Sequence, residues 1–159
     1  MHCVVEIINR FSSPKDLQEI IYDRTVTGYS YAKTKVYVIE YEGEESLIKK
    51  FVEMVFADKV VDNKEYNGKP FYSDAIYIID VELKPGVLDL EKEYAFRYKD
   101  ILSNEGLVIK DLKISQRYYL FGKHSERVKE VFIKSGPINS VIHSYKEVRS
   151  IRKKKQEAR

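Results

Sequence analysis

The sequence predicts an α+β fold built from two tandem β-α-β-α-β units, and three features support this prediction. Apolar residues alternate with a strand-like period in some segments and recur at helical spacing in the segments between them. Residues 35–40 resemble residues 116–121, and the same offset of about 81 positions aligns later segments too. The chain is 43% hydrophobic and 33% charged, as is typical of a folded domain.

The internal repeat defines the predicted organisation of the chain. Its offset places Phe51 on Phe132, and residues 60–61 on 141–142, so that one register serves a strand, a helix and a second strand. Chance seldom produces such agreement over three elements. The predicted parts are a first unit, a linker, a second unit and a basic tail, at residues 1–66, 67–74, 75–148 and 149–159.

In the first unit, residues 3–8 form the predicted first strand. Ser13, followed by Pro14 and by Asp16, resembles the start of a capped helix. A strand over 36–41 and an amphipathic helix over 47–56 follow. Residues 60–61 are the predicted last short strand of this unit.

In the second unit, residues 75–83 alternate toward the end of a strand, and Pro85 with Gly86 ends it. Asp89 opens a helix, and Gly106 suits the position after its end. The predicted buried stripe of this segment recurs at helical spacing: Leu90, Tyr94, Tyr98, Ile101 and Leu102. A long strand over 112–120, a helix from Ser125 to Gly136 and a short strand at 141–142 complete the unit.

In each unit, the helices are expected to cover one face of an antiparallel sheet. The opposite faces of the two sheets can then be buried against each other about a pseudo-two-fold axis, which gives a physical reason for duplication.

Composition excludes several classes of protein. The sequence has no apolar run long enough to span a membrane. Its first residues lack the pattern of a secretion signal. Its single cysteine, Cys3, cannot form an internal disulfide. The cytoplasm is therefore the expected compartment. The net charge of +3 arises in residues 149–159, so the charge distribution argues against nucleic acid as the main partner.

The residues give no strong catalytic pattern. No Gly-rich phosphate loop is present, and the three histidines are isolated along the sequence. The 13 tyrosines suit either half-buried strand positions or a binding surface. We therefore expect no catalytic, cofactor-binding or metal-binding residues in this chain.

Three segments of the second half resemble the PurS subunit of phosphoribosylformylglycinamidine synthase in order and spacing. They are residues 81–89 (Val-Glu-Leu-Lys-Pro-Gly-Val-Leu-Asp), 117–120 (Arg-Tyr-Tyr-Leu) and 134–142 (Lys-Ser-Gly-Pro-Ile-Asn-Ser-Val-Ile). The first is the most specific, and together they cover about residues 75–148. The first half departs from this pattern, because Phe11-Ser12-Ser13-Pro14-Lys15-Asp16 stands where Lys-Pro-Gly-Val-Leu-Asp is expected, whereas residues 57–62 are similar to the last strand of the family.

The resemblance implies a function in purine biosynthesis. PurS proteins are single units that dimerise and bridge a glutaminase subunit and a synthetase subunit. The complex uses glutamine and ATP to amidate formylglycinamide ribonucleotide, and PurS supplies no catalytic residues. ATP, magnesium and glutamine are accordingly expected on the partner subunits. A homo-oligomer is left open, and so is the question of whether the first half keeps a PurS role.

The candidate interface residues lie in the first two of these segments: Lys84, Pro85, Gly86, Asp89, Arg117, Tyr118 and Tyr119. Two alternative functions remain open at this point. A tyrosine-rich sheet with a basic tail suits single-stranded nucleic acid, and paired α+β units suit a small-molecule regulatory module.

Overall fold

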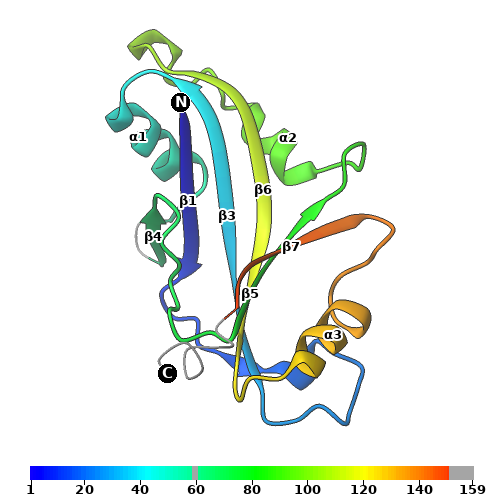
Figure 1. Cartoon of the computed structure of the whole chain (residues 1–159). Helices are drawn as coiled ribbons and strands as arrows, with labels where there is room; N and C mark the ends of the chain where they lie inside the picture. The colour runs from blue at the N-terminus through cyan, green and yellow to red at the C-terminus, as the bar shows by residue number, and fades with distance from the viewer. Residues whose placement is uncertain (59–60, 151–159) are drawn as a thin grey trace, which may run out of the picture. The chain divides into compact units, whose positions relative to one another are not determined.

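The computed structural model describes residues 1–58 and 61–150 and confirms the α+β class (Figure 1). The strands are β1 (His2–Asn9), β2 (Lys15–Asp16), β3 (Ser30–Glu42), β4 (Asp62–Tyr66), β5 (Tyr77–Leu83), β6 (Val108–Phe121) and β7 (His143–Ser150). The helices are α1 (Glu45–Val55), α2 (Leu90–Phe96) and α3 (Glu126–Ser135), with 3₁₀ turns η1 (Leu17–Glu19) and η2 (Ser103–Glu105). Among the described residues, no helix combines the length and apolar character needed to cross a membrane.

The strands form a single antiparallel sheet in the order β4-β1-β3-β6-β5-β7, and the short β2 pairs with β3. The expectation of a separate sheet for each repeat is therefore wrong. The reason is that β3 and β6, the longest strands, pair with each other and continue the hydrogen-bonded ladder from one half of the chain into the other.

The chain divides into two compact units by its internal contacts. Unit 1 comprises Met1–Ser12, Thr34–Phe71 and Gly86–Ser115, and unit 2 comprises 13–33, 72–85 and, as far as it is described, 116–150. Each unit therefore takes segments from both halves of the sequence. Because the units are defined by contacts, they do not test the repeat boundaries at 66, 74 and 148, which stay a prediction.

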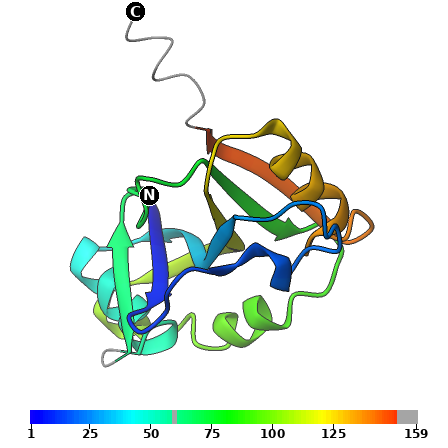
Figure 2. The same cartoon turned by 90° about the horizontal axis from the view of Figure 1, so that it is seen from below.

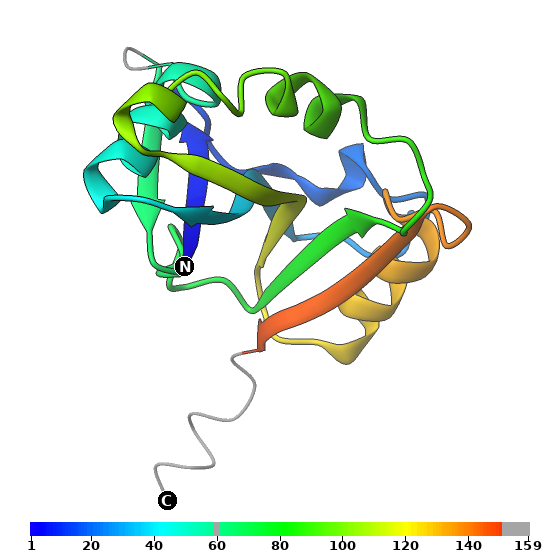
Figure 3. The ribbon, with the colours of Figure 1, turned by 90° about the horizontal axis from the view of Figure 1, so that it is seen from above.

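Unit 1 is built on α1, which lies beside β1 and β3 (Figures 1 and 3). The buried face of α1 is the one that its apolar spacing predicts: Ile48, Phe51 and Val52 pack against β1 and β3. The segment 95–112, from the second half of the sequence, completes this core with Ala95, Leu102 and Leu107.

Unit 2 is built on α3, which lies alongside β5 and β7 (Figures 2 and 3). Val128 and Phe132 of α3 pack against alternate residues of β5 and β6, which confirms the predicted strand and helix patterns. The segment 17–26, from the first half of the sequence, completes this core with Leu17 and Ile21.

The predicted helix after Pro14 is wrong, because this segment forms β2 and the single turn η1. Asp16 does act as a cap, and its carboxylate accepts a hydrogen bond from the Gln18 amide at 2.9 Å. The side-chain amide of Gln18 then bonds to the carbonyl oxygen of Val26, so the chain turns back into a loop. The β-branched and glycine residues that follow, at 25–28, also disfavour a longer helix.

The predicted last strand at 141–142 is wrong by a few residues, since β7 begins at His143. Asn139 forms a turn there, because its carbonyl oxygen accepts the amides of Ile142 and His143 and its side chain accepts the amide of Val141. In the first half, β4 begins at Asp62, and residue 60 of the predicted 60–61 strand lies outside the described residues. The basic tail lies outside them from residue 151.

The helix predicted from Asp89 to Gly106 is confirmed at its start, but α2 ends at Phe96 and is followed by turns and by η2. Its predicted buried face is wrong. Asp89 caps α2 by accepting the Lys92 amide at 3.0 Å. Ala95 and Leu102 are buried, whereas Leu90, Tyr94, Tyr98 and Ile101 are exposed. The orientation follows from Glu91, whose carboxylate is held by Lys35 Nζ and Tyr37 Oη of β3, each at 2.9 Å, so that the face carrying Glu91 and Ala95 turns toward the sheet.

Candidate protein-interaction surface

The first and third segments of the resemblance are joined in unit 2 at the end of β5. The backbone amide of Lys84 donates to the carbonyl oxygen of Ile142 at 2.8 Å. The Lys84 ammonium group donates to the carbonyl oxygen of Ser140 at 2.6 Å. These bonds fix the turn after β5 against the segment 139–142, although the two segments are more than fifty residues apart in the sequence.

The second segment of the resemblance reaches the same strand through an ion pair. Arg117 on β6 donates from Nε to Asp80 Oδ1 at 2.7 Å and from Nη2 to Asp80 Oδ2 at 3.0 Å. This bidentate geometry is the strongest that arginine and a carboxylate form. Arg117 is only 7% exposed, so the pair is an internal link between β5 and β6.

The two candidate tyrosines are also internal to unit 2. Tyr118 donates from its hydroxyl to Gln116 Oε1 at 3.1 Å, and its ring meets Phe132 of α3 edge-on. Burial raises the pKa of Tyr118 to about 12. Tyr119 faces the opposite side of the sheet, where Tyr72 lies edge-on to it at 5.0 Å. In a single chain, neither ring is available to a partner.

Of the seven candidate residues, the exposed ones lie in the turn. Lys84 and Pro85 belong to unit 2, and Gly86, with a φ of +86°, belongs to unit 1. Asp89 is occupied as the cap of α2. The structure therefore places Lys84 just after β5 and ties Arg117 to Asp80 of β5, and of the candidate residues it leaves the turn accessible.

Two exposed apolar residues that sequence reasoning did not select lie near the end of β5: Val141 in the turn that Lys84 contacts, and Tyr145 on β7. Val141 is 78% exposed and sits between the two residues whose carbonyl groups bind Lys84. Tyr145, which is 50% exposed, pairs in register with Val81 on β5. We call Lys84, Pro85, Val141 and Tyr145 the Lys84 surface. No periodicity could have identified it, because residues 139–142 form a turn and not a strand.

A second exposed apolar surface lies in unit 1. It consists of the face of α2 that was predicted to be buried, together with the residues at its two ends. We call it the α2 surface: Leu88, Leu90, Tyr94, Tyr98 and Ile101.

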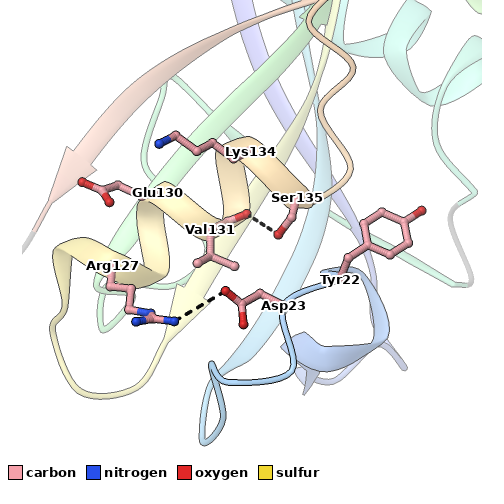
Figure 4. Close-up of a pocket in the computed structure, with 7 residues that line it drawn as sticks. All are labelled: Tyr22, Asp23, Arg127, Glu130, Val131, Lys134 and Ser135. Carbon is pink, nitrogen blue, oxygen red and sulfur yellow. Dashed lines mark hydrogen bonds and ion pairs between the residues drawn. The ribbon is translucent and has the colours of Figure 1, made fainter.

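Unit 2 also has an open pocket of about 650 Å³ between the loop at 22–23 and α3 (Figure 4). Its lining residues are Tyr22, Asp23, Arg127, Glu130, Val131, Lys134 and Ser135.

The charged groups at the centre of this pocket satisfy one another. Arg127 Nη2 lies 3.6 Å from Asp23 Oδ2, and the side chains of Glu130 and Lys134 extend away from Asp23 (Figure 4). Hydrogen bonds from Thr25, and then the charge of Arg127, lower the pKa of Asp23. The lining residues come from both predicted repeats, and a small-molecule regulatory site stays a prediction.

The remaining reactive side chains are dispersed. Within residues 1–58 and 61–150, no three His, Cys, Asp or Glu side chains are grouped as they would be around a metal ion. Cys3 is buried, and burial raises the pKa of its thiol, which lowers its reactivity. His124 lies 3.0 Å from the hydroxyl of the buried Tyr77, where it serves as a hydrogen-bond partner.

Comparison with known protein families, with curated proteins and with solved structures finds no match to this chain.

Proposed function

We propose that this chain is a tandem PurS-like protein that bridges the glutaminase and synthetase subunits of phosphoribosylformylglycinamidine synthase. The observation that carries the proposal is that all three resembling segments contact β5 of unit 2 or the Lys84 turn that follows it. In this proposal, the chain supplies binding surface only. Glutamine, ATP and magnesium bind to the partner subunits, and the cytoplasm is the compartment.

The strand order supports a duplicated unit. From one edge the sheet runs β4-β1-β3, and from the other it runs β7-β5-β6. Apart from the short β2, each half of the sequence contributes three strands: the first lies in a middle position, the second at the centre and the third at an edge. Helix α1 or α3 lies between the second and third of these strands. This correspondence is what a pseudo-two-fold pair requires.

The Lys84 surface is the contact that we propose for a partner subunit. The exposed Lys84 can attract an acidic partner by its charge, and the exposed Val141 and Tyr145 offer apolar area for the contact. The internal Arg117–Asp80 pair would hold β5 and β6 in place beneath it. Arg117 is therefore a positioning residue in this proposal.

The test is co-purification of the chain with separately purified glutaminase and synthetase subunits. The double variant Val141→Asp and Tyr145→Ala places a charge and a truncation on the Lys84 surface, and we expect it to weaken association at least tenfold, or about 1.4 kcal/mol. Tyr22→Ala is the matched control, because Tyr22 is 83% exposed in the same unit but lies in the pocket beside α3. Failure of the unaltered chain to bind either subunit would refute the proposal.

A further inference from the structure

The α2 surface presents five large apolar side chains that are between 38% and 70% exposed. Leu90, Tyr94, Tyr98 and Ile101 recur at intervals of three or four residues, so they lie along one side of α2 and of the turns that follow it. Single exposed apolar residues are ordinary, but a continuous stripe on one side of a helix marks a binding surface.

The two tyrosines of this stripe are arranged as one aromatic platform. Their rings are 5.2 Å apart in an edge-on contact, and the Tyr98 hydroxyl donates to the Tyr94 hydroxyl at 3.3 Å. Aromatic side chains held by each other contribute strongly to protein contacts, because little conformational entropy is lost when they are buried.

Two charges of opposite sign, Glu93 and Arg97, lie beside the middle of the stripe. Glu93 lies near the start of α2 and Arg97 lies just after its end, and both side chains are exposed. In the part of the chain that the structure describes, neither side chain has a hydrogen-bond or ion-pair partner. They are four residues apart, so they occupy the same side of the helical segment.

This distribution is complementary to itself. When two copies of the segment lie antiparallel, Glu93 of each copy faces Arg97 of the other, and Leu90 of each approaches Ile101 of the other. Antiparallel pairing also sets the positive end of one helix dipole beside the negative end of the other. A parallel arrangement would place like charges opposite each other.

We propose that the α2 surface binds the α2 surface of a second copy of this chain in an antiparallel, two-fold contact. This contact joins two copies of the chain through residues of unit 1. It does not depend on the enzyme partners proposed above, whose contact is the Lys84 surface. A contact through one short helical stripe belongs to the small, transient class of interfaces, so we expect the dimer to dissociate on dilution.

Sedimentation velocity of the full-length chain at increasing concentration tests the proposal. We expect a reversible change from one chain to two. Tyr94→Asp should abolish the two-chain species, whereas Glu130→Arg, a charge reversal at an exposed site on α3, should leave it unchanged. Circular dichroism of each variant checks that the fold is retained. We expect it to be, because these side chains are exposed.

Charge exchange identifies the antiparallel geometry. Glu93→Arg alone and Arg97→Glu alone should each weaken self-association at least tenfold, because each places like charges opposite each other. Mixing the two single variants should restore a mixed dimer, and combining both changes in one chain should restore self-association. A chain that stays monomeric at all concentrations would overturn the proposal, and so would a dimer that Tyr94→Asp does not affect. Failure of the combined Glu93→Arg and Arg97→Glu changes to restore self-association would also overturn it.

Discussion

At the scale of single residues, the Arg117–Asp80 ion pair is largely buried, with exposed side-chain fractions of 8% and 18%. The guanidinium group donates two hydrogen bonds to Asp80, which accepts them through both of its carboxylate oxygens. A buried pair gains little over apolar replacements, but removing one partner leaves the other charge in a poorly solvated site.

Arg117→Met should therefore lower the free energy of unfolding by about 3 kcal/mol, because Asp80 loses its partner. Asp80→Leu should be destabilising for the same reason. In the double variant, the loss should be well below the sum of the two single losses, as measured by urea unfolding. Losses that add to within about 0.5 kcal/mol would show that the two residues act independently.

Tyrosine ionisation should limit stability at alkaline pH. Burial raises the pKa of Tyr118 and of Tyr66 to about 12 from an ordinary value of 10.0. Because the folded-state pKa is the higher one, this contribution to stability is fully present below pH 10 and is lost as pH rises from 10 toward 12. Urea unfolding over this range should show a decline that is less steep for Tyr118→Phe. An unchanged slope would contradict the assigned cause.

At the scale of elements, the end of α3 depends on Gly136. A Cβ atom there would collide with the carbonyl oxygen of Phe132, which cannot move without breaking the last turn of the helix. By contrast, a Cβ at Gly86 would meet nothing within 4 Å, although its φ of +86° disfavours other residues.

Gly136→Ala should accordingly lower the free energy of unfolding by about 2–3 kcal/mol through steric strain. Gly86→Ala should lower it by only about 1 kcal/mol through its backbone conformation. Thermal unfolding of both variants makes the comparison. Equal losses would mean that α3 shifts to accept the added methyl group.

Periodicity predicts an element where a single buried face sets the spacing of apolar residues. Both α1 and α3 satisfy this condition, and the alternating residues of β6 do so as well. Periodicity failed for α2, because the carboxylate of Glu91, and not the apolar stripe, is fixed to the sheet through Lys35 and Tyr37. No local pattern shows that Glu91 has distant partners on β3.

The candidate site was predictable in part for a similar reason. The order of the three resembling segments singled out Lys84 and Arg117, and the structure ties both to β5 or its end. Sequence alone could not show that Tyr118 and Tyr119 are both buried, because neighbouring strand residues face opposite sides of a sheet. Both are covered only because Phe132 lies on one side and Tyr72 on the other.

At the scale of the whole molecule, the two halves of the sequence exchange core segments. Residues 95–112 complete the core of unit 1, and residues 17–26 complete the core of unit 2. Neither half of the sequence contains a full core of its own, so folding of each half depends on residues from the other.

Separate fragments 1–71 and 72–159 should each fail to unfold cooperatively, because each lacks the side chains that complete a core. Mixing the two should restore a cooperative urea transition and the near-ultraviolet circular dichroism of the intact chain. Cooperative unfolding of either fragment alone would contradict the exchange of segments.

The central proposal, that this chain bridges two enzymes, is tested most directly by glutamine-dependent amidation of formylglycinamide ribonucleotide. The assay combines purified glutaminase and synthetase subunits with and without the chain. We expect activity that depends on the chain, falls with the Val141→Asp and Tyr145→Ala variant, and is absent with the chain alone. Full activity of the two enzymes without the chain would contradict the proposal, as would turnover by the chain in isolation.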